Sequence, residues 1–104
     1  MIDRPTILPE AAADLEDQER YLGERGGIDL VITFAEAARK TFDFLAKNPN
    51  IGERYPSRAE DLAGLRVWKI DGFPKHLVFY RPTEDRLEIV RVMHGHRQID
   101  RILG

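Results

Sequence analysis

The first half of the chain carries hydrophobic residues at helical spacing. Ala11, Leu15 and Leu22 are separated by one or two helical turns, which predicts an amphipathic helix. Pro9 suits its first turn, because proline lacks only an N–H group that has no helical partner there. Gly26-Gly27 predicts its end, since glycine adopts the left-handed capping conformation at little cost.

A second helix is predicted from about Asp29 to Lys47, where one apolar stripe continues at three- and four-residue spacing. The stripe consists of Val31, Phe34, Ala35, Ala38, Phe42 and Leu45. Asn48-Pro49 ends this helix, because the residue before a proline avoids the α conformation. Two helices joined by a Gly-Gly turn predict an antiparallel helical hairpin.

From residue 65 the hydrophobic period changes from 3.6 to 2. The pattern predicts strands at residues 65–70, 76–81 and 87–93, and the short turns between them indicate an antiparallel meander. Residues 49–63 contain Gly52, Pro56 and Ser57 and are expected to be irregular. A short strand at Thr6-Ile7-Leu8 is expected to pair at an edge of the same sheet.

These elements predict a single α+β domain over residues 1–104. The N-terminal helical hairpin should pack on one face of a small antiparallel β-sheet, because that face is the large apolar surface available to it. Hydrophobic residues make up 42% of the chain and charged residues 33%, as in ordinary folded domains. The N-terminus does not resemble a secretion signal, and no apolar run is long enough to span a membrane. We therefore expect a cytoplasmic protein without membrane contact.

The net charge of −2 argues against binding nucleic acid by bulk electrostatics. The charge is distributed unevenly, however. Residues 1–63 carry 8 Lys+Arg against 13 Asp+Glu, whereas residues 64–104 carry 8 against 5 and all three histidines. An anionic partner, if there is one, would be met by the C-terminal part; an uneven solvated surface is the alternative interpretation.

The densest group of functional side chains is His94-Gly95-His96-Arg97. A metal site needs three or four converging ligands, of which His-x-His supplies two, and the chain has no cysteine, so we expect no metal and no cofactor. RNA cleavage would need a base, an acid and cations near the phosphate. Strand alternation places Lys69 on the face opposite Arg66 and Trp68, so these cations cannot all converge. The candidates for such a nuclease are Lys69, His76, Arg81, His94, His96 and Arg97.

The order of motifs along nearly the whole chain resembles the ParE branch of the RelE/ParE toxin superfamily. The resemblance rests on residues 9–11, 14–15, 21–22, 48–52, 65–66, 73–74, 77–81 and 89–97, the last reading Ile-Val-Arg-Val-Met-His-Gly-His-Arg. It implies a type II toxin with a ParD-like ribbon-helix-helix antitoxin, whose C-terminal region would lie along the hairpin and the sheet. Antitoxin-binding candidates are Leu15, Gln18, Tyr21, Leu22, Trp68 and Phe73.

The resemblance also implies an activity. ParE-like toxins are associated with inhibition of DNA gyrase, whereas RelE-like toxins cut mRNA on the ribosome. Lys69 and Arg97 fall on plausible RelE positions and His76 lies where an arginine is expected, but no tyrosine follows Tyr80. This favours the ParE-like activity. Two residues depart from the usual ParE pattern: Gln18 stands at an apolar position of the first helix, and Leu8 replaces its capping residue.

Three hypotheses follow. The first is a non-enzymatic gyrase inhibitor that an antitoxin neutralises in a hetero-oligomeric complex. The second is a ribosome-dependent mRNA endoribonuclease that uses His94, His96 and Arg97. The third is an inactive, toxin-like binding module that assembles with its antitoxin.

Overall fold

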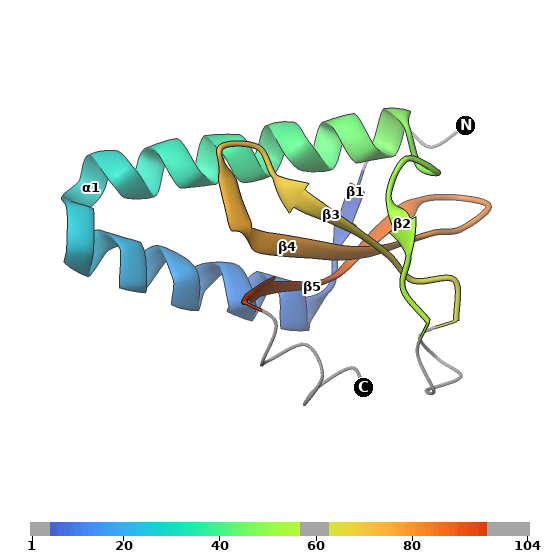
Figure 1. The fold of residues 1–104 in the computed structure, drawn as a ribbon, viewed down its shortest axis with the longest axis horizontal. Helices are drawn as coiled ribbons and strands as arrows, with labels where there is room; N and C mark the ends of the chain where they lie inside the picture. The colour runs from blue at the N-terminus through green and yellow to red at the C-terminus, as the bar shows by residue number, and fades with distance from the viewer. Residues whose placement is uncertain (1–4, 57–62, 96–104) are drawn as a thin grey trace.

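The structure, a computed structural model, describes residues 5–56 and 63–95. The elements follow the order β1 (Pro5–Ile7), α1 (Pro9–Lys47), β2 (Glu53–Arg54), β3 (Arg66–Ile70), β4 (Phe73–Pro82) and β5 (Leu87–His94). Two long helical segments run antiparallel beside one sheet (Figure 1), which confirms the predicted α+β class. Within the described residues, no helix has the length and hydropathy needed to span a bilayer.

The element labelled α1 is a helical hairpin, because its backbone breaks at Gly27. Gly27 has φ 75° and ψ −171°, a conformation that residues with a Cβ rarely adopt. The break divides α1 into an N-terminal arm, residues 9–26, and a C-terminal arm, residues 28–47. The predicted Gly-Gly turn is therefore confirmed. Leu8 at the N-cap makes no side-chain hydrogen bond. Instead, its backbone N–H donates to the Ile89 carbonyl at 3.0 Å, which ties the helix start to β5.

The five strands form one sheet in the order β1-β5-β4-β3-β2. Strands β3, β4 and β5 form the predicted antiparallel meander, and β1 pairs in parallel with β5 at one edge. Two features were not predicted. The stretch expected to be irregular contains β2, which pairs with the start of β3. Strand β4 also begins three residues earlier than expected, because the chain pairs with β3 directly after the turn at Gly72.

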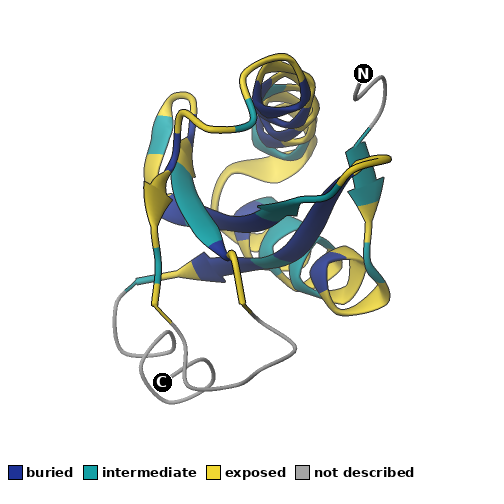
Figure 2. Cartoon of the chain, turned by 90° about the vertical axis from the view of Figure 1, so that its right-hand side faces the viewer, coloured by how far each residue is buried: buried dark blue, intermediate teal, exposed yellow. Residues whose placement is uncertain are grey.

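The main core lies between the helical hairpin and one face of the sheet. Most of the predicted stripe of the second helix is buried there, with Phe34, Ala38, Phe42 and Leu45 each at 3% exposure or less. Ala35 is exposed, so the prediction for that residue was wrong: the stripe is narrower than its spacing suggested. Figure 2 shows the buried segments where the arms face the strands. From the sheet, this core receives Ile70, Val78, Tyr80, Leu87, Ile89 and Val92.

A second, smaller apolar cluster was not predicted. Leu65, Phe79, Val90 and Met93 are buried together in a group separate from the main core. Phe79 and its neighbour Tyr80 belong to different clusters, as alternation along a strand requires. The register between β4 and β5 shifts at Phe79/Tyr80, where Val90 is the additional residue on β5. Both faces of the sheet therefore hold buried apolar side chains.

Candidate functional site

A surface pocket of about 390 Å³ lies between the N-terminal arm of α1 and the ends of β4 and β5. Its lining is more polar than apolar, whereas the lining of small-molecule sites is mostly apolar. Its walls contain both histidines that the structure describes. The lining residues are Asp14, Asp17, Gln18, Tyr21, His76, Arg91, Val92, Met93 and His94.

Two side chains of the N-terminal arm satisfy the outer edge of β5 beyond the end of β1. The Val92 N–H donates to Asp14 Oδ2 at 2.9 Å, and Gln18 Nε2 donates to the Val92 carbonyl at 2.7 Å. A strand edge otherwise exposes such groups for pairing with another chain. Here helix side chains take the place of a neighbouring strand. This explains Gln18, which departs from the apolar pattern because a backbone carbonyl needs a donor at this point.

His76 is buried at the floor of the pocket, with 5% of its surface exposed. Its Nδ1 lies 2.7 Å from Gln18 Oε1, and its ring contacts Phe34 and Phe73. The tautomer follows from the network. A carbonyl only accepts, so Gln18 turns its amide nitrogen to Val92 and its oxygen to His76, whose Nδ1 must then carry the proton. Burial first, and His94 second, lower the pKa of His76 to about 4, so the ring is neutral at pH 7.

His94 stands directly opposite His76 in the β4–β5 register. The ring centroids of the two imidazoles are 4.7 Å apart, with an angle of 55° between the planes. The Tyr21 ring lies 6.4 Å from that of His94, and the Arg25 guanidinium lies over Tyr21 at 4.6 Å. Unlike His76, His94 is exposed. The pocket therefore pairs a buried imidazole with an accessible one.

Arg91 forms the main ion pair of the pocket. Its Nε and Nη2 atoms donate to the two carboxylate oxygens of Asp14 at 2.7 and 2.9 Å, and Glu10 lies 3.5 Å away. The hydrogen bonds to Asp14 raise the pKa of Arg91, so it is fully charged. Two carboxylates thus face one guanidinium. Asp17, also in the wall, is paired with Arg20 at 3.4 Å, and Arg25 lies over Tyr21, so the carboxylates around this pocket are balanced by guanidinium groups.

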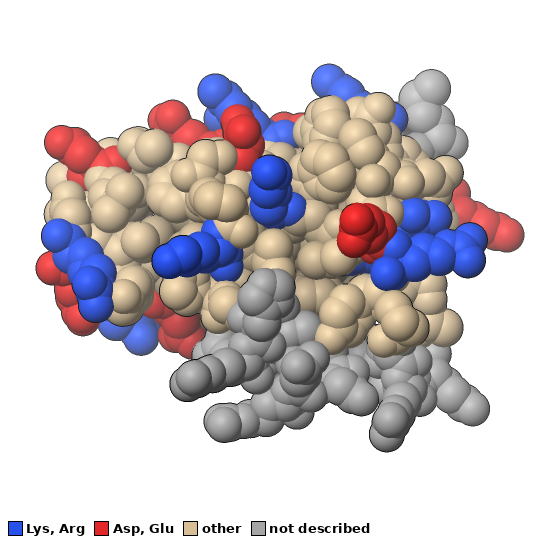
Figure 3. All heavy atoms as spheres, in the orientation of Figure 1, with Lys and Arg blue, Asp and Glu red and all other residues tan. Residues whose placement is uncertain are grey.

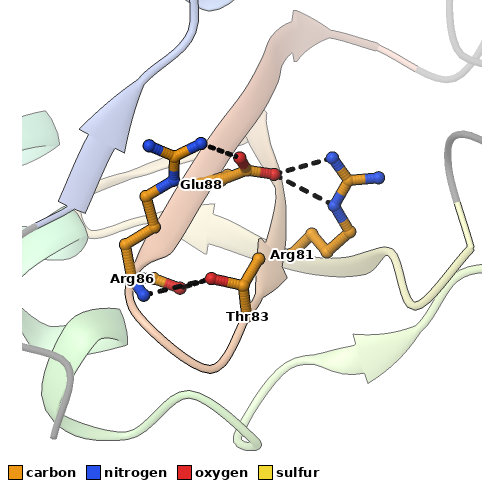
Figure 4. A network of polar contacts seen from close by, with 4 residues as sticks. All are labelled: Arg81, Thr83, Arg86 and Glu88. Carbon is orange, nitrogen blue, oxygen red and sulfur yellow. Dashed lines mark hydrogen bonds and ion pairs between the residues drawn. The ribbon is translucent and has the colours of Figure 1, made fainter.

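The remaining nuclease candidates lie elsewhere. Lys69 pairs with Leu77, and Arg81 pairs with Glu88. Strand alternation places Lys69 and Arg81 on the face opposite Trp68 and Tyr80. Their side chains therefore point away from His76. Arg81 Nη2 donates to Glu88 Oε1 at 2.6 Å and Arg86 Nη2 donates to Glu88 Oε2 at 3.0 Å (Figure 4). The bond from Arg81 is the main reason that the pKa of Glu88 is lowered. His96 and Arg97 lie outside the described residues.

Basic side chains are also dispersed on the surface. On the face drawn in Figure 3, the described Lys and Arg side chains form separate groups divided by uncharged surface. Nucleic-acid sites typically collect such residues into a continuous patch. Among residues 5–56 and 63–95, no three His, Cys, Asp or Glu side chains are grouped so that they could hold a metal ion.

The antitoxin-binding candidates fall into two groups. Leu15, Leu22 and Phe73 contribute to the main core, and Gln18 is committed to His76 and Val92. Tyr21 is 45% exposed. Trp68 is half-buried and lines a second pocket of about 340 Å³, which it shares with Lys40, Thr41, Phe44 and Asp71. The surface these candidates offer is therefore mainly Tyr21 on the hairpin and Trp68 beside Phe44.

Comparisons with known proteins identify the class of the chain. The sequence model of the family described as ParE toxin of type II toxin-antitoxin system, parDE, matches residues 6–99. This chain therefore belongs to the ParE toxin family.

Individual relatives agree with this assignment. Toxin ParE1 of Mycobacterium tuberculosis is 32% identical over 104 residues, covering 99% of this chain and 100% of the relative. Toxin ParE1 of Caulobacter vibrioides is 35% identical over 85 residues, 81% of this chain and 80% of the relative. A chain from the chromosomal ParDE TA system of P. aeruginosa has a similar fold, with a TM-score of 0.73 and 17% identity, covering 91% of this chain and 98% of that one. The protein is a ParE-family toxin of a ParDE-type toxin–antitoxin system.

Proposed function

We propose that this toxin arrests growth by inhibiting DNA gyrase in the cytoplasm, and that a ParD-like ribbon-helix-helix antitoxin neutralises it. The family membership of the chain supports a toxin of this class. The observation that carries the choice of gyrase over mRNA is the distribution of the candidate catalytic side chains. Lys69 and Arg81 lie on one face of the sheet, whereas His76 lies on the other.

RNA cleavage requires an acid, a base and cations within reach of the same phosphate. In the described part of the chain, the sheet separates Lys69 and Arg81 from His76 and His94, and Arg81 is held by Glu88. Arg91 is likewise held by Asp14. The net charge of −2 gives little electrostatic attraction to RNA. A toxin that acts by binding a protein target needs none of these groups to converge.

Exposed apolar side chains support a protein partner. Tyr21, Ile28 and Ile32 on the helical hairpin are 45%, 68% and 49% exposed, and Phe44 on the same hairpin is 41% exposed. Amphipathic segments of a partner bind surfaces of this kind by covering such side chains. We propose that the antitoxin covers part of this surface.

The test is a supercoiling assay with purified gyrase, the untagged toxin and relaxed plasmid. Inhibition that the cognate antitoxin reverses is the expected result. The His94→Ala variant should inhibit as well as the original chain, because His94 is exposed and has no catalytic role in this proposal. Circular dichroism establishes that the variant is folded.

Pulse-labelling of cells that express the toxin alone separates the alternatives. DNA synthesis should fall before protein synthesis. If protein synthesis falls first and transcripts are cleaved, the endoribonuclease hypothesis replaces this one. If growth continues while the antitoxin still binds, the chain is an inactive binding module.

A further inference from the structure

The outer edge of β3 is only partly covered by a neighbouring strand. β2 pairs with the first two residues of β3, and within the described residues no strand lies beside residues 68–70 on that side of the sheet. The Tyr55 N–H donates to the Leu65 carbonyl at 2.8 Å, so the backbone groups of Leu65 point toward this edge. Backbone groups alternate sides along a strand, which directs those of Lys69 to the same edge. That edge therefore presents a backbone donor and an acceptor to a further strand.

A groove lined by two aromatic side chains lies beside this edge. It is the pocket of about 340 Å³ between the C-terminal arm and the end of β3, and its lining is more apolar than polar. The rings of Phe44 and Trp68 have centroids 6.0 Å apart, with an angle of 34° between their planes. Thr41 joins the two sides of the groove, because its Oγ1 donates to the Ala37 carbonyl at 2.8 Å and accepts the Asp71 N–H at 3.1 Å. The groove is therefore held in shape by contacts within the chain.

We propose that an extended segment of the antitoxin adds to this edge of β3 as a strand and places an apolar side chain in the groove; this inference rests on the proposed function, which supplies the antitoxin. An added strand would lie about 4.8 Å from β3. The antitoxin residue opposite Trp68 has its side chain on the same face of the sheet as Trp68, toward Phe44. Strand addition of this kind gains affinity from backbone hydrogen bonds and specificity from pockets for alternate side chains.

Charge selects the chemistry of the added segment. Lys40 and Asp71 line the groove with opposite charges, so the exposed side chain of Lys69 sets the preference. A second copy of this chain does not fit, because antiparallel pairing of two such edges over residues 68–70 places one Lys69 opposite the other, and like charges directly opposite are destabilising. An acidic residue at that position is favourable instead. The complementary segment is therefore an extended peptide in which an acidic residue adjoins a large apolar one.

The groove also adjoins the surface proposed for the antitoxin. Phe44, which is 41% exposed, belongs both to the groove and to the exposed apolar side chains of the helical hairpin. An antitoxin that covers part of the hairpin can therefore reach the edge of β3 at this side chain.

Amide hydrogen exchange of the untagged toxin, free and in complex with its full-length cognate antitoxin, tests the added strand. The Lys69 N–H should exchange at least about tenfold more slowly in the complex, because strand addition gives it an acceptor. Ile7 provides the matched control on the opposite edge. The Leu8 N–H donates to the Ile89 carbonyl, so the Ile7 N–H points away from β5, and its exchange should stay fast. Equal slowing at both amides would overturn the assignment to β3.

Variants test the backbone and the groove separately by calorimetric titration with the antitoxin. Lys69→Pro removes an N–H that the sheet does not use, which an edge strand tolerates, and should weaken binding at least about tenfold. Lys69→Ala keeps that N–H and should weaken binding less. Phe44→Ala should weaken binding at least about tenfold, whereas Ile7→Ala, at a side chain 43% exposed, should bind as the original chain does.

The outcomes distinguish this inference from the proposed function. Antitoxin that binds while the Lys69 amide stays unprotected, or that binds the folded Lys69→Pro and Phe44→Ala variants with full affinity, would overturn the added strand alone. Antitoxin that does not bind the original chain would overturn both the added strand and the proposed neutralisation.

Discussion

At the scale of single residues, Tyr80 fixes the segment that follows the helical hairpin. Its buried hydroxyl donates to the Pro49 carbonyl at 3.0 Å and accepts from the Gly52 N–H at 2.8 Å. A Cβ on Gly52 would lie 2.6 Å from that hydroxyl and 2.8 Å from the Val67 carbonyl oxygen. Glycine is therefore required here by close approach rather than by backbone conformation.

Gly52→Ala should destabilise the protein by about 2–4 kcal/mol. The added Cβ pushes the segment at residue 52 away from the Val67 carbonyl and weakens the hydrogen bond from its N–H to the Tyr80 hydroxyl. Urea unfolding measures the loss. The added Cβ would also lie 2.8 Å from Tyr80 Cε1. Tyr80→Phe removes the hydroxyl, one of these three close atoms, so the double variant should cost less than the sum of the single variants. Full additivity would show that the alanine does not act through this contact.

His76 gives stability a dependence on pH. Its pKa is lowered from 6.5 to about 4 in the folded state, so the unfolded chain binds its proton more readily. The stabilising contribution is present above pH 6.5 and is lost as the pH falls towards 4. Between pH 7 and pH 5 the free energy of unfolding should fall by up to about 2 kcal/mol from this group.

The measurement is urea unfolding at pH 7, 6 and 5, an interval chosen to lie above the titration of Glu88, whose pKa is lowered. His76→Gln removes the ionisable ring and should flatten the profile over the same range. An equally steep profile in that variant would assign the effect to other groups.

At the scale of elements, the N-terminal arm and β5 are joined by side chains that replace a strand. Asp14 accepts the Val92 N–H, and Gln18 donates to the Val92 carbonyl. A helix attached in this way holds β5 in register beyond the three residues that β1 reaches. It also occupies an edge that would otherwise be open to another chain.

Asp14→Ala should raise the hydrogen-exchange rate of the Val92 amide by about tenfold or more, since it removes the acceptor of that N–H. Asp14→Asn is the control, because it keeps an acceptor oxygen and loses the charge that faces Arg91. Its effect on Val92 should be smaller. Equal acceleration in both variants would attribute the protection to the ion pair instead.

The elements themselves were largely predictable. Gly26-Gly27 marked the turn of the hairpin, and apolar periodicity located the arms and the meander. Strand β2 was not predicted, because two residues are too few to show alternation of apolar and polar positions. Strand β4 was predicted too short, because Phe73-Pro74-Lys75 does not alternate in this way. The site was predictable only in part. Gln18 and His76 are polar residues at core positions, which is a visible signal, but their contact depends on how the arm crosses the sheet.

At the scale of the whole molecule, strand register decides which functional side chains meet. The sequence placed His94 beside His96, yet the fold places His94 opposite His76, eighteen positions away in the chain. The same alternation separates Lys69 and Arg81 from that pair. Sequence neighbourhood could not reveal this, because the register between β4 and β5 includes a shift at Phe79/Tyr80.

The contacts of the N-terminal arm with Arg91 and Val92 also bear on when the domain can fold during its synthesis. They join residues 74 to 81 positions apart, and β5 lies between β1 and β4 in the sheet. The N-terminal arm is thus synthesised well before its partners on β5. Contacts this distant in sequence form late and slowly. The N-terminal arm therefore cannot reach its final packing until β5 has been synthesised, and the sheet is completed only when that strand inserts between β1 and β4.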